Sequence, residues 1–573
     1  MVYRGPSKGC QTCRRRRVKC DEVRPACGNC IKRKQQCPGY RDLFDAVHKD
    51  ETLATSQKNS TKKSSRTDVI EECIISDSNS SGSATQLSTP SSSQSDSLVM
   101  LVSPSRVVET ECLTYFFANY VNIPRDPSTN IFIEHILPLY INAPLESALT
   151  HAANAVAINV AQMWMHRGID SSLARESYAK AVSLVKFALQ DPVQSKTDDT
   201  LAAVFLLDFY DSLNKRFVGF IDSGMHQQGA MALLRYRGKE NFESATSQRL
   251  FTALRSRHIN FSLQAGKKVQ LDGDLLAEET ALLPSAKLDL INAELADLHV
   301  IVPEGPEAMD VGLVEFYQTI MQRALAVDQK LQAWRSALPE SWRPVAIPAS
   351  QLHPSIRAAG VYGDTVDVYS SLTVSHVNNA SRSSHVGALR LISLCRRELE
   401  ALGIEADPAL SQYLQTQMQE IADRFCASIP YHLGNRTTLT FPHEHREYPH
   451  VPVELRRLAN YVDPFGNPVE MTQEDHIRAA AAIGGWFMMT PLMGFLRAPF
   501  LRSRHAIPGP LVSTLREGQL DWVRGQMQRL QNIYALPANA APEWKFPLRN
   551  IGTGAGHKEV LKETSWNRQL WQV

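Results

Sequence analysis

Six cysteines lie within the first 37 residues, and their spacing constrains this part of the chain more than any other feature does. They form two copies of one pattern, in which a Cys-x-x-Cys pair is followed, after six further residues, by a third cysteine. Thiolates at such spacing typically hold tetrahedral zinc, and six of them can satisfy two zinc ions if two sulfurs are shared. The six candidate ligands are Cys10, Cys13, Cys20, Cys27, Cys30 and Cys37.

The charge of the same segment indicates its partner. Residues 1–41 carry a net charge of +10, whereas the whole chain of 573 residues carries only +2. The remainder is therefore mildly acidic. A basic head on an acidic body is expected when only one end of a chain meets a polyanion, and nucleic acid is the natural candidate.

A disulfide framework is the main alternative for six cysteines. The N-terminal sequence Met-Val-Tyr-Arg-Gly-Pro has no apolar signal core, which argues against an extracellular protein and for zinc. About 30 residues rich in Arg and Lys cannot bury enough apolar surface to offset their backbone entropy. We therefore expect the head to be unfolded without metal.

The stretch from Cys10 to Cys37, including Cys-Gln-Thr-Cys-Arg-Arg-Arg-Arg-Val-Lys-Cys-Asp, resembles the fungal binuclear zinc cluster, the DNA-binding module of fungal transcription regulators. The resemblance implies that the first and fourth cysteines bridge two zinc ions. One ion would then lie on Cys10, Cys13, Cys20 and Cys27, and the other on Cys10, Cys27, Cys30 and Cys37. It also implies a tight turn at Pro25, between the two halves.

Each Cys-x-x-Cys pair is expected to open a short helix, and the first helix is expected to continue to Lys19. By resemblance, its end lies in the DNA major groove over a CGG-like triplet, where Arg17 hydrogen-bonds guanine. The other basic side chains are expected to contact phosphates, which adds affinity without sequence information. These backbone contacts are Arg14, Arg15, Arg16, Lys19, Lys32 and Arg33. The run of arginines also suits nuclear import, so the sequence predicts a nuclear protein.

The chain is expected to contain three parts: the zinc cluster in residues 1–45, a disordered linker in 46–106 and a helical domain in 107–573. The linker is crowded with Ser, Thr and charged residues and has no sustained apolar period. No heptad pattern follows the zinc module, so a coiled-coil dimer is not expected there. The protein should bind DNA as a monomer, or as a dimer held by the helical domain.

Helical periodicity dominates residues 107–573, which we therefore interpret as a large all-α domain with one large core or two smaller ones. Three apolar faces at helical spacing support this interpretation: 174–189, which stops at Asp191-Pro192, 388–402, which stops at Gly403, and 520–534.

This part also resembles the helical regulatory domain that follows the zinc cluster in many fungal regulators. The likeness is carried by residues 111–120, 145–149 and 226–234. It implies transcription coregulators as partners and allows a small-molecule effector, for which no residue can be assigned. His226 is expected to be a hydrogen-bonded structural residue.

Other functions find less support in the sequence. No catalytic motif is present, although an active site assembled only by the fold would be invisible here. A zinc module that binds protein or RNA is a further alternative, which competition between duplexes and RNA would test. The apolar stretch 479–496 is expected to be a buried helix pair and not a membrane span, so no membrane partner is expected. His443, His445 and His450 are expected to lie in an irregular loop without metal, and residues 552–556 in a flexible turn.

Overall fold

The computed structural model describes residues 10, 12, 13, 16, 18, 20, 21, 27–33, 35 and 37 near the N-terminus. Beyond them it describes residues 104–129, 132–165, 171–218, 224–238, 241–269, 271, 283–304, 306, 309, 311–405, 407–438, 446–496 and 515–534. The chain forms two compact units, Met1–Leu98 and Val99–Val573. The predicted linker lies almost wholly outside the described residues, except that a helix begins at Pro104, slightly before the expected start of the helical domain.

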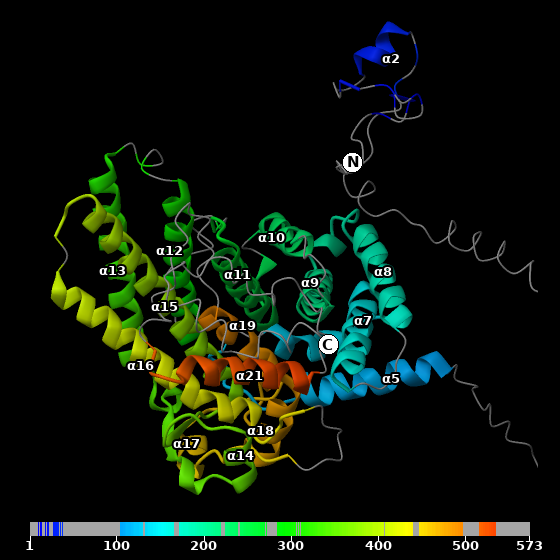
Figure 1. Ribbon diagram of the computed structural model, residues 1–573. Helices are drawn as coiled ribbons and strands as arrows, with labels where there is room; N and C mark the ends of the chain where they lie inside the picture. Colours follow the sequence, from blue (N-terminus) through cyan, green and yellow to red (C-terminus); the bar gives the residue numbers. More distant parts are fainter. Residues whose placement is uncertain are drawn as a thin grey trace, which may run out of the picture. The chain divides into compact units, whose positions relative to one another are not determined.

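The second unit is built of α-helices, as predicted (Figure 1). Its α-helices are α5 (Pro104–Phe116), α6 (Ile136–Tyr140), α7 (Ala148–Met165), α8 (Ser171–Ala188), α9 (Asp198–Val218), α10 (Met225–Arg237), α11 (Ala245–Ala265), α12 (Pro284–Glu304), α13 (Leu313–Ser336), α14 (Pro354–Ala359), α15 (Leu372–Ala401), α16 (Pro408–Leu433), α17 (Val453–Leu458), α18 (Gln473–Ala479), α19 (Gly485–Leu496) and α21 (Gln519–Ile533). Two π-helical turns, η1 (Phe117–Val121) and η10 (Ala480–Gly484), and four 3₁₀ turns, η2 (Phe132–His135), η3 (Gln194–Lys196), η8 (Glu340–Trp342) and η9 (Ala349–Gln351), complete the described helical elements.

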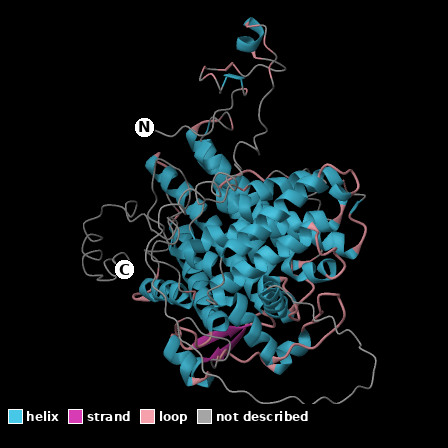
Figure 2. Ribbon diagram, turned by 90° about the vertical axis from the view of Figure 1, so that its right-hand side faces the viewer, coloured by secondary structure: helices cyan, strands magenta, loops and turns pink. Residues whose placement is uncertain are grey.

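One antiparallel hairpin interrupts the helices (Figure 2). Strand β1 (Val345–Pro348) pairs with β2 (Thr365–Val368), with Val345 opposite Val368 and Pro348 opposite Thr365. The last three residues of β2 are buried. Because β2 packs against α16, the hairpin buries its apolar side on the helical core.

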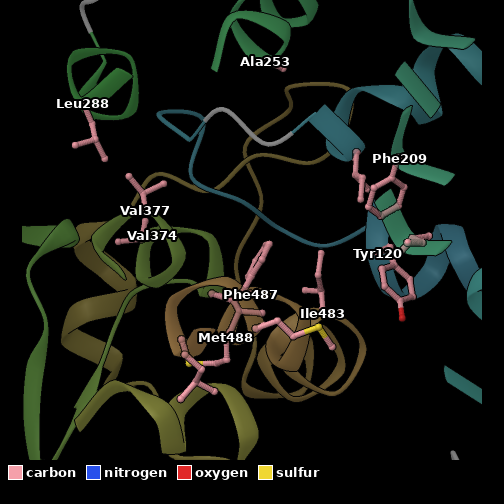
Figure 3. Packing of buried hydrophobic residues seen from close by; sticks show 14 of the residues in the cluster. Tyr120, Phe209, Ala253, Leu288, Val374, Val377, Ile483, Phe487 and Met488 are labelled. Atoms are coloured by element: carbon pink, nitrogen blue, oxygen red, sulfur yellow. The ribbon is translucent and has the colours of Figure 1, made fainter. Parts of the chain in front are cut away.

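One large hydrophobic core joins the helices of the second unit, so the first of the two arrangements that the sequence left open is the observed one. Two small clusters lie beside it, one around Ile259 and Ala296 and one around Tyr461 and Met471. Among the described residues the large core runs from Cys112 in α5 to Tyr534 after α21. Figure 3 shows side chains from distant segments meeting in it, including Tyr120 of η1, Phe209 of α9 and Phe487 of α19. The described helices therefore form one folding unit and not a chain of separate bundles.

The three apolar faces predicted from the sequence lie in α8, α15 and α21, and most of their residues are buried or half-buried. Two positions were predicted wrongly: Leu189 and Leu402 are 49% and 42% exposed. Each lies directly after the last residue of its helix. Its N–H still donates to the carbonyl four residues earlier, Val185 for Leu189 and Glu398 for Leu402, but its side chain is exposed to solvent at this end of the helix.

The apolar stretch 479–496 is buried or half-buried over residues 479–492, as expected, but it is not a pair of helices. The last residue of α18, η10 and α19 follow one another without a loop, and the π-turn lies between the α-helices. The widened turn offers carbonyls to other elements: Tyr120 Oη donates to Ala482 O (3.0 Å) and Arg436 Nη1 to Ala481 O (2.7 Å). Within the described part of the chain, no helix has the length and hydropathy needed to cross a membrane.

A buried polar network fastens α13, α15 and α16 together. His385 Nε2 donates to Asp328 Oδ1, and Tyr413 Oη and Gln332 Nε2 donate to Asp328 Oδ2 at 2.5 and 2.9 Å. Arg335 Nη2 lies 2.9 Å from His385 Nδ1. Since arginine can only donate, Nδ1 accepts and the ring carries its proton on Nε2. Burial would raise the pKa of Asp328, but its hydrogen bonds from His385 and Tyr413 bring that pKa below the usual value.

The variant Asp328→Asn is expected to lower the free energy of unfolding by about 3 kcal/mol, because removing one partner of a buried charged network leaves the others unpaired. Urea unfolding followed by tryptophan fluorescence measures the change. Glu294→Gln is the matched control, since its carboxylate pairs with Lys330 at the surface and should contribute less than about 1 kcal/mol. Equal shifts in the two variants would contradict a special role for the network.

Candidate metal centre

The six N-terminal cysteines gather into one cluster within the first unit. Cys10, Cys13, Cys27 and Cys30 are buried, with at most 2% of their surface exposed, and the remaining two are half-buried. None is in a disulfide. The segment carries a net charge of +10, and its buried cluster consists of cysteines alone. An ordinary apolar core therefore does not explain why these thiols are buried.

The sulfurs form two groups of four, and within each group all sulfurs lie within 4.8 Å of one another. One group contains Cys10, Cys13, Cys20 and Cys27, and the other contains Cys10, Cys27, Cys30 and Cys37. Cys10 and Cys27 belong to both groups. These are the two sets that the family resemblance implied.

The distances between sulfurs fit tetrahedral zinc. Four sulfurs at about 2.3 Å from a zinc ion are about 3.8 Å from one another. In the structure, Cys10 Sγ lies 3.7 Å from Cys27 Sγ and 3.8 Å from Cys30 Sγ, and Cys13 Sγ lies 3.7 Å from Cys27 Sγ. The shared pair Cys10–Cys27 thus has the length of an edge common to two tetrahedra.

The Cys-x-x-Cys spacing creates this geometry locally. Cys27 caps helix α2 (Gly28–Lys32), and its Sγ accepts a hydrogen bond from the Cys30 N–H at 3.4 Å. In the first half, Cys10 Sγ accepts from the Cys13 N–H at 3.5 Å. A residue three positions later in a helical turn lies on the same face, so each pair presents two sulfurs together.

The chemistry of the cluster favours a bound cation. A hydrogen bond with Cys27 is the main cause that raises the pKa of Cys30 to about 12, and burial raises the pKa of Cys13 well above its ordinary value. At neutral pH these thiols need a nearby positive ion to become thiolates, and divalent zinc supplies that charge. The donor set and its geometry therefore fit two zinc ions.

The predicted DNA-contacting residues are only partly described. Arg16, Lys32 and Arg33 are exposed, and the Arg16 N–H donates to the Thr12 carbonyl at 3.2 Å, as in a helical turn. The remaining predicted contacts and the predicted turn residue lie outside the described residues: Arg14, Arg15, Arg17, Lys19 and Pro25.

The second unit offers no comparable set of ligands. Among the residues that the structure describes, no group of His, Cys, Asp and Glu other than the two cysteine sets could hold a metal ion. Cys112, Cys395 and Cys426 are buried and are not in a disulfide. His226 Nε2 lies 2.7 Å from Tyr178 Oη, as expected for a structural histidine. His443, His445 and residues 552–556 lie outside the described residues.

Asp21 is the feature of this centre that sequence reasoning missed. The Gly28 N–H donates to its Oδ2 at 2.8 Å and to its Oδ1 at 3.2 Å. A carboxylate directly after Cys20, inside a strongly basic segment, was the signal that could have identified it.

Comparison with known proteins identifies the first unit. Residues 8–46 match the family model of the fungal Zn(2)-Cys(6) binuclear cluster domain, a domain that binds two zinc ions. An uncharacterised transcriptional regulatory protein of Schizosaccharomyces pombe is 69% identical over 32 residues, which cover 6% of each chain. White-opaque regulator 2 of Candida albicans is 51% identical over 43 residues, or 8% of this chain and 10% of that protein. Sterol uptake control protein 2 of the same species is 39% identical over 85 residues, which cover 14% of this chain and 11% of that protein.

These matches span at most about a tenth of the relatives' own length, and no solved structure matches the chain. The likeness therefore concerns the zinc cluster and its immediate surroundings.

Proposed function

Since residues 8–46 are a fungal Zn(2)-Cys(6) binuclear cluster domain, we propose that the protein is a zinc-dependent, sequence-specific DNA-binding transcription regulator. The observation that carries the proposal is the pair of four-sulfur groups that share Cys10 and Cys27. The names of the relatives, all transcriptional or regulatory proteins, support a regulatory function and not an enzymatic one.

In this proposal one zinc ion is held by Cys10, Cys13, Cys20 and Cys27, and the other by Cys10, Cys27, Cys30 and Cys37. Zinc supplies the stability that this small basic segment lacks, on the order of 10 to 16 kcal/mol in comparable peptides. The ions are structural: with every position taken by sulfur, none is left for a substrate.

The basic side chains around the cluster would face double-stranded DNA. Arg17 would read a guanine of a CGG-like triplet, because a guanidinium can donate to both O6 and N7. The other basic residues would contact phosphates, and the exposure of Arg16, Lys32 and Arg33 supports this part of the proposal. Binding should weaken steeply as salt rises, since each phosphate contact releases counterions.

The helical unit would regulate this activity in the nucleus. Its large core of its own and the long polar sequence between it and the zinc cluster suit a domain that contacts coregulators while the zinc unit contacts DNA. We propose the boundaries 1–45, 46–106 and 107–573 for the three parts. Dimerisation, if it occurs, would use the helical domain.

Zinc content and duplex selection, measured on the full chain, test the proposal. Two zinc ions per chain and enrichment of a CGG-containing site from a randomised duplex pool are expected. Two zinc ions without an enriched duplex would contradict DNA reading, and a competition with RNA would then show whether the zinc module binds another nucleic acid.

The variant Arg17→Ala is expected to keep both zinc ions and to weaken binding to the selected duplex by about 1 to 3 kcal/mol, with little change on a scrambled duplex. Fluorescence anisotropy with both duplexes measures this. Arg15→Ala is the matched control, because loss of a phosphate contact should weaken both complexes alike. Equal losses on both duplexes for Arg17→Ala would contradict its role in base reading.

A further inference from the structure

The carboxylate of Asp21 connects the two halves of the cysteine cluster. It accepts the Gly28 N–H with both oxygens, at 2.8 and 3.2 Å. Asp21 directly follows Cys20, and Gly28 directly follows Cys27, so this contact joins the backbone beside one cysteine to the backbone beside another. Both cysteines belong to the same group of four sulfurs.

We propose that Asp21 is a positioning residue of the zinc centre, which acts through the shared sulfur of Cys27. This inference rests on the proposed two-zinc assignment. The contact joins residues 21 and 28 by a charge-assisted hydrogen bond. It thereby fixes the place at which the second half of the cluster starts.

The first turn of α2 explains why this hydrogen bond orients sulfurs. The first N–H groups of a helix have no partner within the helix. The Cys30 N–H donates to Cys27 O (3.0 Å) and Cys27 Sγ (3.4 Å), whereas the Gly28 N–H turns outward and Asp21 accepts it. The orientation of the peptide that carries Cys27 is therefore fixed by Asp21 on one side and by Cys30 on the other.

The absence of a side chain at Gly28 makes room for this contact. A Cβ atom at this position would lie 2.5 Å from Asp21 Oδ2, closer than such atoms approach each other. The backbone of Gly28 is helical, so alanine would be excluded by the carboxylate and not by its own φ angle. Because a carboxylate is the end of a flexible side chain, Gly28→Ala should displace it and break the hydrogen bond while leaving the backbone in place.

A carboxylate in this position opposes the other functions of the segment. It lies beside a cluster of thiolates, which would repel it, and it would itself repel the phosphates that the surrounding basic side chains are proposed to meet. The contact with Gly28 is what offsets this disadvantage. If it served only as a surface hydrogen bond, its loss would leave the metal centre unchanged.

The rate of zinc release from the full chain to a chromophoric chelator tests the proposal. Asp21→Ala is expected to release zinc about tenfold faster, since outer-shell partners typically contribute 10- to 100-fold to metal affinity. Asp21→Asn should restore slow release, because its amide oxygen can still accept the Gly28 N–H. Glu22→Ala is the matched control, as it makes the same charge change at the next residue and should release zinc at the parent rate.

Cobalt substitution and a double variant separate positioning from general stability. The sulfur-to-cobalt absorption bands should change in Asp21→Ala and remain parental in Asp21→Asn. Gly28→Ala should speed zinc release as Asp21→Ala does, and the combined variant should be no faster than either. Equal release rates for Asp21→Ala and Glu22→Ala, or fully additive effects with Gly28→Ala, would overturn the inference. A parent protein that binds fewer than two zinc ions would instead overturn the proposed function.

Discussion

The variant Cys27→Ala is expected to bind neither zinc ion, to leave the N-terminal unit unfolded and to bind no specific duplex. Cys27 lies in both groups of four sulfurs, so its removal leaves each group with three. Its Sγ also caps α2, which has only five residues and cannot persist alone. Loss of metal removes on the order of 10 kcal/mol of folding free energy from a segment with no other core. Elemental analysis of the full chain and duplex binding by anisotropy measure the effect.

Two further variants test whether the loss of both zinc ions is specific to a shared sulfur. Cys13→Ala removes a sulfur from one group only, so it should retain part of the zinc. Cys395→Ala removes a buried thiol from α15 and should leave both zinc ions and duplex binding unchanged. If Cys27→Ala kept both ions, the shared-sulfur arrangement would be wrong.

Acidification from pH 7 to pH 5 is expected to destabilise the helical unit by several kcal/mol. Burial lowers the pKa of His476 and of His135 to about 3 and that of His258 to about 4, and neighbouring positive groups add to each effect. All three side chains are less than 9% exposed. These histidines are neutral in the folded protein.

The direction of this pH effect on stability depends on whether the folded or the unfolded chain binds more protons. Between the unfolded pKa of 6.5 and the lower folded values, the unfolded chain binds more protons, so stability falls as pH decreases through this window. At pH 5 each buried histidine can contribute a loss of about 2 kcal/mol. Buried carboxylates act in the opposite direction, because burial raises the pKa of Asp126 and of Asp367. Urea unfolding at pH 7, 6 and 5 measures the net effect.

His476 offers the sharpest test of this pH dependence. Its ring stacks on the Tyr431 ring, with the two ring centroids 4.3 Å apart. The described residues provide no hydrogen-bond partner for either of its nitrogens. His476→Phe should therefore keep the stacking and reduce the loss of stability between pH 7 and pH 5 by about 2 kcal/mol. Tyr431→Phe is the control: it removes the hydrogen bond from Tyr431 Oη to Tyr369 O and should lower stability equally at both pH values. An unchanged pH dependence in His476→Phe would contradict the assignment.

The metal centre was largely predictable from the sequence because its geometry is local. A Cys-x-x-Cys pair places two sulfurs on one helical turn, whatever the rest of the chain does. The contact between Asp21 and Gly28 was not predictable in this way. It joins residues seven positions apart that share no helix or strand, and spacing alone does not determine such a contact.

The helical class was predictable from apolar periodicity, but the ends and irregularities of helices were not. Leu189 and Leu402 continue the apolar pattern at ends of helices that the core does not cover, so periodicity assigned them wrongly to the core. The π-turn η10 depends on tertiary partners, since Tyr120 and Arg436 come from other elements to bond its carbonyls. The backbone at Gly484 lies so close to the His432 carbonyl that a Cβ atom there would be 2.3 Å from its oxygen. This contact forms only in the tertiary structure.

The hydrogen bond from Tyr120 to Ala482 joins positions 362 residues apart, and it bears on the order of events during synthesis. The zinc ligands all leave the ribosome within the first 37 residues, so the metal centre can form while most of the chain is still untranslated. The core of the helical unit includes Tyr534 and cannot close until about 500 more residues have been added. At about 5 to 20 residues per second, this interval is roughly 25 to 100 s. The nascent protein would therefore carry a formed zinc centre while the apolar faces of the helical unit are still unpaired.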